Sequence, residues 1–378
     1  MSKKRLFEAV ATLTGCTMGA GILGIPYVVA RAGVVTGLVN IALVGLMFVI
    51  INLSLGEVTL RTKGRHQLTG YAGKYLGKLG KYLMFIAVII GDFGAIIAYI
   101  LGGGIALGAL LGTSEMLASV IFFAVIAFLI YIGIKAIEDS EAIFSPILLG
   151  VLVFFIVMAF LKFSPSNFSG FSTNNFFLPF GVIMFAMIGS AAIPEMREEL
   201  GREKKKLKKA ILIGTLIPLV FYAIFAVAIV GAHGLSTNPI GSMNLVSIIG
   251  PKLSFLGELF AVFSMTTSFL AIGLALKEIF WFDLGMRKNT SWLIACGAPF
   301  LIFLLVKIFK LANFINILDI SGTVGGVMVG SIILLMALKS RKLSERKPEY
   351  ELRIKPFIIY GLVGLLILGG IAKLFLMI

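Results

Sequence analysis

The chain has 378 residues, of which 59% are hydrophobic and only 13% are charged. A soluble domain of this size cannot bury so much apolar surface, which excludes an ordinary water-soluble fold. The formal net charge of +15 would suit a nucleic-acid-binding protein, but the basic residues lie in short loops between long apolar stretches, so no nucleic-acid partner is expected.

Apolar stretches of about 20 residues predict membrane-spanning α-helices, since a helix rises about 1.5 Å per residue across a hydrocarbon layer about 30 Å thick. The predicted spans are 8–30, 35–60, 82–111, 116–134, 142–162, 176–196, 210–231, 254–281, 291–309, 313–338 and 355–376. The sequence therefore predicts an all-α membrane protein with about eleven transmembrane helices, embedded in a lipid bilayer.

The positions of Lys and Arg predict the orientation of the chain. With the N-terminus in the cytosol, most of the 33 lysines and arginines fall on the inner side, as the positive-inside rule requires. The outer positions are Arg31, Lys162, Lys252, Lys307, Lys310 and Lys373, and Lys277 lies near the inner end of its helix. We expect a multi-pass protein of the cell membrane with a cytoplasmic N-terminus.

Two basic segments lie on the predicted inner side. The segment 61–81 mixes basic residues with Leu and Tyr, which favours an interfacial helix on the inner leaflet, with a partner-binding site as the alternative. The segment 339–355 is rich in both signs of charge and is expected to be a solvated loop.

Two predicted spans contain residues that interrupt a helix. The first holds four glycines and a proline between Thr14 and Pro26, and the sixth holds Gly189, Ser190 and Pro194. Each Gly costs about 1 kcal/mol of helix propensity relative to Ala, and Pro about 3 kcal/mol. Unwound backbone inside a membrane is tolerated only where it is buried in protein or lines a cavity. Both breaks are therefore predicted to lie at a central cavity.

The two breaks divide a single domain, 1–378, into two halves of five spans, about 8–162 and about 176–338. Because five is an odd number, the halves must have opposite orientations, which defines an inverted repeat. The span at about 355–376 is an extra helix. Paired broken spans point to the central site of a secondary transporter. The alternative is that these glycines only allow close packing between helices.

At the breaks the sequence resembles a known family. The run Gly19-Ala-Gly-Ile-Leu-Gly-Ile-Pro26 resembles the first-span signature of the amino acid/auxin permease group, within the amino acid–polyamine–organocation superfamily. Gly189–Glu195 with its following basic run looks like the sixth span, and Thr267-Ser-Phe-Leu270 is similar to the eighth span of hydroxy/aromatic amino acid permeases. The resemblance implies a LeuT-type fold, five spans plus five plus one, and a permease that moves an amino acid by alternating access.

The same resemblance implies where a substrate binds. The residues concerned are Thr17, Met18, Gly19, Ala20, Gly21, Phe185, Ala186 and Gly189. Amides at the first break would meet the substrate carboxylate, so a Cβ on Gly19 or Gly21 would intrude. Carbonyls near Thr17 and from Ala186 onwards would meet the ammonium, and Phe185 would cover the site. Opposed half-helix dipoles suit such a zwitterion.

Buried acidic residues are candidates for coupling or gating. Asp92 lies about ten residues into the third span, where a carboxylate costs roughly 3 kcal/mol or more, so it must face the bundle interior. It is a candidate for proton carriage or substrate contact, and the alternative is a structural hydrogen bond. Glu195 follows the sixth-span break and is a candidate for gating or protonation, with an ion pair to the basic run as the alternative.

Topology alone suggests two gate pairs, Arg31 with Asp319 on the outer side and Arg5 with Asp283 on the inner side. The carboxylate of Glu57, near the inner end of its span, is expected to snorkel to the interface.

Sodium is the predicted coupling ion. Ser264, Thr267 and Ser268 share one helix face, and in the matching fold they lie opposite the carbonyls of Gly15 and Met18. Five neutral oxygens suit a monovalent cation, since a divalent ion normally recruits carboxylates. The alternatives are that these hydroxyls only bond carbonyls one turn back, or that the register is shifted by one to Thr266 and Thr267.

Proton coupling through Asp92 or Glu195 stays open. Ile22 stands where sodium-coupled relatives carry an Asn, which argues against a sodium site at the substrate carboxylate. Proton-coupled relatives can carry a Lys within the fifth span, and 142–161 contains none. No cofactor other than the coupling ion is expected.

Competing functions are an ion channel and a carrier of another small zwitterionic or organic-cation solute. An enzyme is excluded because no His, Cys or Ser cluster has catalytic spacing in any span. No obligate protein partner is evident, and the sequence does not reveal which amino acid is carried.

Overall fold

The computed structural model describes residues 2–133, 136–239 and 254–377, together with the isolated positions 244, 248 and 250. Side chains are described at these positions except at 2–3, 136–145 and 254. Regular structure in this part of the chain is helical, without a strand. Lys135 and Lys252, which entered the topology prediction, lie outside the described residues.

The helices fall into two sets separated by the loop 161–179. The first set is α1 (Ser2–Thr17), α2 (Gly21–Ala32), α3 (Val34–Arg61), α4 (Leu68–Leu111), α5 (Glu115–Ile132) and α6 (Ala136–Phe160). The second set is α7 (Phe180–Met187), α8 (Ala192–Leu200), α9 (Leu207–His233), α11 (Ser254–Glu278), α12 (Lys288–Trp292), α13 (Ala298–Phe309), α14 (Phe314–Ile320), α15 (Val327–Lys342) and α16 (Pro356–Phe375). Short 3-10 turns are η1 (Pro165–Asn167), η2 (Gly201–Lys206) and η3 (Gly234–Ser236), and π-helical turns are η4 (Ile279–Asp283), η5 (Leu293–Gly297) and η6 (Ser321–Gly326).

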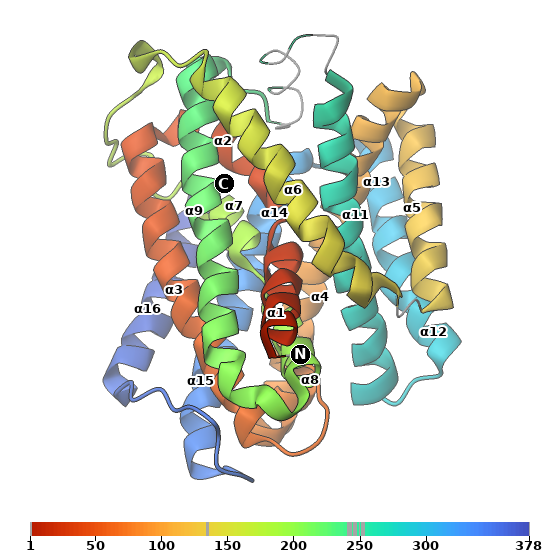
Figure 1. Cartoon of the computed structure of the whole chain (residues 1–378), viewed down its shortest axis with the longest axis vertical. Helices are drawn as coiled ribbons and strands as arrows, with labels where there is room; N and C mark the ends of the chain where they lie inside the picture. Colours follow the sequence, from red (N-terminus) through yellow and green to blue (C-terminus); the bar gives the residue numbers. More distant parts are fainter. Residues whose placement is uncertain are drawn as a thin grey trace.

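The predicted spans are found in the structure. Among the described residues, eight helical segments are long and apolar enough to cross a membrane, and the bent pair Lys4–Thr17 and Gly21–Ala32 makes a ninth. The segment Phe180–Ser236 is 57 residues long and reverses direction between α8 and α9, so it contains two spans (Figure 1). Pro146–Phe160 is a shorter apolar helix within the predicted fifth span. The prediction of an all-α membrane protein with about eleven spans is confirmed.

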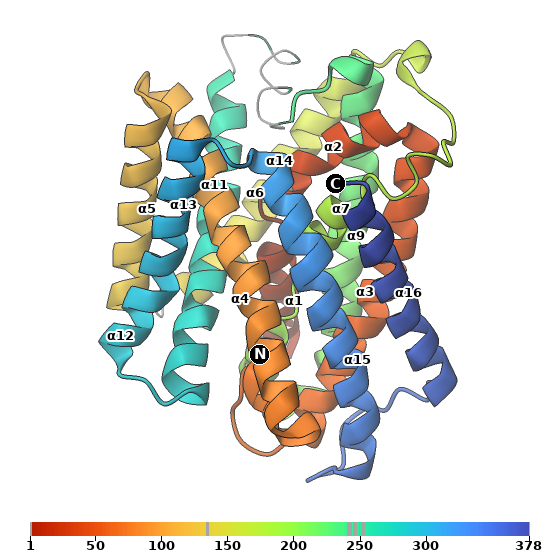
Figure 2. The ribbon, with the colours of Figure 1, turned by 180° about the vertical axis from the view of Figure 1, so that it is seen from behind.

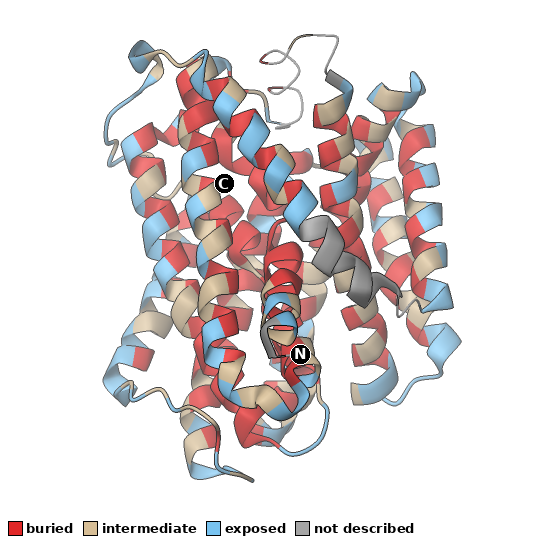
Figure 3. Ribbon diagram, viewed as in Figure 1, coloured by how far each residue is buried: buried red, intermediate tan, exposed pale blue. Residues whose placement is uncertain are grey.

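The broken helices lie inside the bundle. Figures 1 and 2 show α1 and α7 in the middle, with α5 and α13 on one flank and α16 on the other. In the middle, α1 packs against α8 and α9, while α2 packs against α7 and α9. Buried residues line the inner faces, and exposed apolar residues face outward, as expected for a surface in contact with lipid (Figure 3).

The basic segment 61–81 contains the start of α4. This helix begins at Leu68 and is interrupted at Gly77, whose φ of 73° and ψ of −164° lie outside the helical region. Glycine reaches such a conformation without the clash that a Cβ would cause. The stretch before Gly77 is thus a separate helical segment, in agreement with the helix expected there.

Most charged side chains of the segment after α15 are exposed, as expected for a solvated loop, but two of its residues also bond to α3. Tyr350 donates its hydroxyl hydrogen to the Leu53 carbonyl at 2.7 Å, and the Leu352 amide donates to Glu57 at 3.1 Å. Glu57 is fully buried and also accepts from Arg61 at 2.8 Å, so its expected snorkelling is wrong. Glu57 and Arg61 thus form a buried ion pair at the inner end of α3.

The two gate pairs expected from topology do not form. Asp319 pairs with Lys373 of α16 at 2.7 Å, and Arg31 lies over an aromatic ring at 5.5 Å. Asp283 accepts hydrogen bonds from the Thr69 hydroxyl and from the backbone amide that follows it. Topology predicts the height of a residue in the membrane but not the direction of its side chain, which explains both errors.

The Asp319–Lys373 pair is buried, with 7% and 5% of the two residues exposed. Removal of one partner leaves an uncompensated charge, which costs about 3–5 kcal/mol for a buried pair. We expect Lys373→Met to lower the free energy of unfolding by about this amount, and Lys373→Met with Asp319→Asn to recover much of it, measured by chemical denaturation in detergent.

The matched control is the exposed pair of Lys307 and Glu115, in which Lys307→Met should cost less than about 1 kcal/mol. Equal losses at the two lysines would contradict the assignment of Lys373 to a buried, tightly coupled pair.

Candidate functional site

Two helix breaks face each other in the middle of the bundle. The backbone leaves the helix between Thr17 and Gly21, where the axis bends by 53°, and again between Met187 and Ala192. Each break gives one half-helix a free C-terminus and the next a free N-terminus, so partial negative and positive charges lie close together. The predicted interruption of the first and sixth spans is confirmed.

The first break has free donors. In the described part of the chain, the amides of Ala20 and Gly21 donate to no backbone carbonyl. Both residues are fully or almost fully buried at the N-terminal end of α2. These are two of the amides that the family resemblance assigns to a substrate carboxylate, and a helix N-terminus attracts an anion.

The free carbonyls of the same break accept hydrogen bonds from side-chain hydroxyls. Ser264 of α11 donates to the Met18 carbonyl at 2.8 Å, and Ser268 lies 3.5 Å from the Gly15 carbonyl. Both serines are fully buried. The structure thus brings these two serines to the two carbonyls named for a sodium site.

Neighbouring hydroxyls on α11 bond within their own helix. Thr267 donates to the Ser264 carbonyl at 3.1 Å, and Thr266 donates to the Val262 carbonyl at 2.7 Å. In this structure Thr267 therefore does not reach the break through its hydroxyl, and Thr266 bonds one turn back.

Glycines at the breaks are in close contact with protein. An ideal Cβ on Gly21 would lie 2.5 Å from Cα of Ala186, across the gap between the two breaks. A Cβ on Gly19 would lie 2.5 Å from Oγ of Ser268 and 3.0 Å from the Tyr99 hydroxyl. The family resemblance predicts a substrate carboxylate in this space. In the structure, the space beside Gly21 is occupied by Ala186.

Two tyrosines that were not predicted as site residues, Tyr222 and Tyr99, lie at the breaks. Tyr222 of α9 donates to the carbonyls of Thr17 and Ala186. The ring of Tyr99 on α4 meets Phe185 edge-on with centroids 6.4 Å apart. Tyrosines within apolar spans often serve only in packing. These two differ from such residues only in where their hydroxyls lie, which the sequence does not show.

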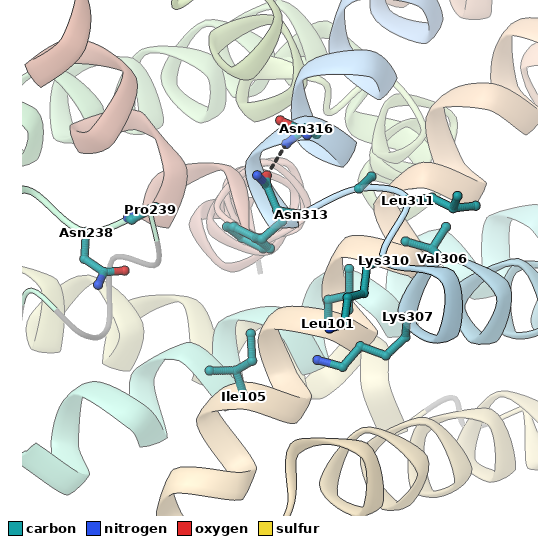
Figure 4. A pocket seen from close by; sticks show the side chains of 12 residues that line it. Leu101, Ile105, Asn238, Pro239, Val306, Lys307, Lys310, Leu311, Asn313 and Asn316 are labelled. Atoms are coloured by element: carbon teal, nitrogen blue, oxygen red, sulfur yellow. Dashed lines mark hydrogen bonds between the residues drawn. The ribbon is translucent and has the colours of Figure 1, made fainter.

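A cavity lies on each side of the breaks. The larger one, roughly 560 Å³, is at the end of the bundle away from the N-terminus and opens between α4 and the α13–α14 connection (Figure 4). Its polar lining includes Asn313 and Lys310. A small one on the N-terminal side lies between α1, α8 and α11 and is lined by Thr12, Cys16 and Glu195 among others.

Asp92 lies outside the breaks. It is half-buried on α4, two helical turns before Tyr99 on the same face. Within the described part of the chain it forms no hydrogen bond or ion pair. The structural hydrogen bond that was the alternative for Asp92 is thus not seen, and its functional role stays a prediction.

Facing helix breaks, free amides and carbonyls at their ends, and a cavity on either side are the features of a membrane transporter with a central site. The sequence profile of the Tryptophan/tyrosine permease family matches residues 2–373. The chain belongs to this family and is therefore an amino acid permease and not an enzyme.

Individual relatives support this assignment. The chain is 23% identical over 367 residues to glutamine transporter 2 of Aliivibrio fischeri, with 93% of each chain covered. It is 27% identical over 304 residues to tyrosine-specific transport system 2 of Haemophilus influenzae, which covers 74% of this chain and 73% of the relative. The crystal structure of MhsT in complex with L-phenylalanine superposes with a TM-score of 0.73 at 16% identity, covering 97% of each chain. The predicted LeuT-type fold is confirmed.

The contact between Gly21 and Ala186 predicts an effect of a single methyl group. Gly21→Ala should push α2 away from α7, because overpacking costs about 1–3 kcal/mol and the α7 backbone cannot rotate aside as a side chain can. We expect a large loss of uptake into proteoliposomes. Gly364→Ala is the control, since no atom lies within 4 Å of its ideal Cβ. Normal uptake by Gly21→Ala would show that the breaks tolerate separation.

Asp92 forms no hydrogen bond or ion pair within the described part of the chain, so its carboxylate is not expected to stabilise the fold. Asp92→Asn should therefore keep the melting temperature within a few degrees of the original while lowering uptake, because it removes the charge at constant volume. Uptake and melting are measured on the same preparation. Unchanged uptake would remove Asp92 from the mechanism.

Proposed function

We propose that this chain is a secondary active transporter of the cell membrane that carries a neutral amino acid, coupled to sodium, with its N-terminus in the cytosol. The observation that carries the proposal is the meeting of two half-helix ends, with free amides at Ala20 and Gly21 and carbonyls at Thr17 and Ala186. An α-carboxylate suits the first set and an α-ammonium suits the second.

The contacts at the breaks support a substrate with an uncharged side chain. They come from hydroxyls, aromatic rings and aliphatic groups, such as Ser268, Tyr99 and Phe185. A charged substrate side chain would require an oppositely charged partner in so buried a place. Glutamine, tyrosine and L-phenylalanine, which the names of the similar proteins mention, are all neutral amino acids.

Alternating access is supported by the two cavities. One is lined by Leu101, one helical turn or less from Tyr99 on α4, and the other, of only about 10 Å³, is lined by Cys16 at the end of α1. We infer that each widens toward the breaks in one of the two access states. The basic residues of the N-terminal side favour a cytosolic position for that side.

Sodium coupling is supported by Ser264 and Ser268, whose hydroxyls already point at the Met18 and Gly15 carbonyls. If each serine hydroxyl turned about its Cβ–Oγ bond, its lone pairs would face the space beside the two carbonyls. The two hydroxyls and two carbonyls would then offer a cation a set of neutral oxygens. The competing proposal is proton coupling, for which Glu195 beside the small cavity is a candidate.

The test is uptake of L-tyrosine and L-glutamine into proteoliposomes, first under an inward sodium gradient at fixed pH and then under a pH gradient without sodium. We expect uptake to follow the sodium gradient. Ser264→Ala with Ser268→Ala should raise the sodium concentration for half-maximal uptake by about tenfold or more, equivalent to about 1.4 kcal/mol of ion binding.

The control is Thr266→Ala, on the same helix, whose hydroxyl bonds one turn back and should leave sodium dependence unchanged. Uptake that follows only the pH gradient, with no effect of the serine substitutions, would reject sodium as the coupling ion.

A further inference from the structure

Tyr222 connects the two breaks from outside both of them. It lies on α9, its side chain is fully buried, and its hydroxyl is 2.7 Å from the Thr17 carbonyl and 3.1 Å from the Ala186 carbonyl. Thr17 is the last residue of α1 and Ala186 lies at the end of α7. The hydroxyl therefore sits between the C-terminal ends of two half-helices.

These two carbonyls are unusually strong acceptors. Each lies at the negative end of a helix dipole, and both are buried. The Thr17 carbonyl also accepts the Gly19 amide at 3.0 Å, so the Ala186 carbonyl is the one that depends more on the Tyr222 hydroxyl. A phenol has a single hydrogen, which it divides between the two carbonyls. A primary ammonium has three hydrogens and a positive charge, so it would satisfy both carbonyls better than the hydroxyl does.

The hydroxyl and an ammonium would compete for the same acceptors. Thr17 and Ala186 are among the positions at which the family resemblance places the substrate ammonium. The hydroxyl hydrogen of Tyr222 points into that place in this structure.

We propose that Tyr222 stands in for the substrate ammonium: its hydroxyl joins the two breaks while the site is empty and releases the Thr17 and Ala186 carbonyls when an amino acid binds. This inference rests on the proposed function, because it requires a substrate with a primary ammonium. The substrate must then displace the Tyr222 hydroxyl from the two carbonyls, and this cost lowers its apparent affinity.

Two other roles predict different results. If Tyr222 is a permanent brace, its hydroxyl bonds persist with substrate bound, and removing them destabilises both states equally. If Tyr222 binds the substrate directly, removing the hydroxyl weakens binding.

The experiment is Tyr222→Phe, which keeps the ring and removes the hydroxyl. Binding of L-tyrosine and L-glutamine is measured by titration calorimetry in detergent, and melting is measured with and without saturating L-tyrosine. We expect a lower melting temperature without ligand, a smaller difference from the original protein with ligand, and a Kd that falls about threefold to tenfold, the range given by one net hydrogen bond.

Two controls isolate the ammonium. The ligand 3-(4-hydroxyphenyl)propionate lacks the ammonium of tyrosine, so Tyr222→Phe should not tighten its binding. Tyr350→Phe removes a hydroxyl bond to the Leu53 carbonyl far from the breaks and should lower melting equally with and without L-tyrosine.

An unchanged or increased Kd for L-tyrosine in Tyr222→Phe would overturn the inference while leaving the proposed function intact. Absence of amino acid binding to the original protein would overturn both. If Tyr222→Phe fails to fold, 3-fluorotyrosine at position 222 gives a second test: its fluorine resonance should shift with L-tyrosine and stay in place with 3-(4-hydroxyphenyl)propionate, and a resonance that ignores both would reject the inference.

Discussion

The centre of this protein depends on one requirement: backbone carbonyls released by a broken helix inside a membrane must find donors. The carbonyls of Gly15, Thr17 and Met18 lose their usual helical donors at the end of α1, although the Thr17 carbonyl still accepts the Gly19 amide, and lipid cannot supply donors. Ser268 and Ser264 from α11 and a tyrosine from α9 supply hydroxyl hydrogens instead. Side-chain hydroxyls thus take the place of helical donors at the first break.

Small residues allow the broken helices to approach so closely. Gly21 of α2 leaves no room for a side chain beside Ala186, and Gly322 in η6 contacts the backbone of α7 near Phe185. Close-packing glycine was the alternative to glycine as a helix breaker. Both explanations apply to Gly21. It lies at the helix break, and its lack of a Cβ lets α2 come close to Ala186 of α7.

Two buried charges near α3 and α7 are paired, whereas Asp92 on α4 has no partner among the described residues. Asp319 lies against Gly181 of α7 and takes its counter-ion from α16, while Glu57 is held by Arg61 at the end of α3 nearest α15. Such buried pairs need matched partners, since either charge alone would be costly. The contacts at the breaks come from hydroxyls, rings and aliphatic groups, on which the proposed preference for a neutral side chain rests.

The sequence by itself determined the spans, the two breaks and the common helix face of Ser264 and Ser268, because hydropathy, helix propensity and helical periodicity are local properties. That this face meets the first break came from the family resemblance and is seen in the structure. Tertiary structure alone decided that Tyr222 bridges the breaks, that Asp319 pairs with Lys373, and that the segment after α15 packs along α3. Those contacts depend on how each helix is rotated about its axis against distant neighbours, and no local pattern encodes that rotation. In a span that is apolar on all sides, the rotation of the helix about its axis is determined by packing against its neighbours.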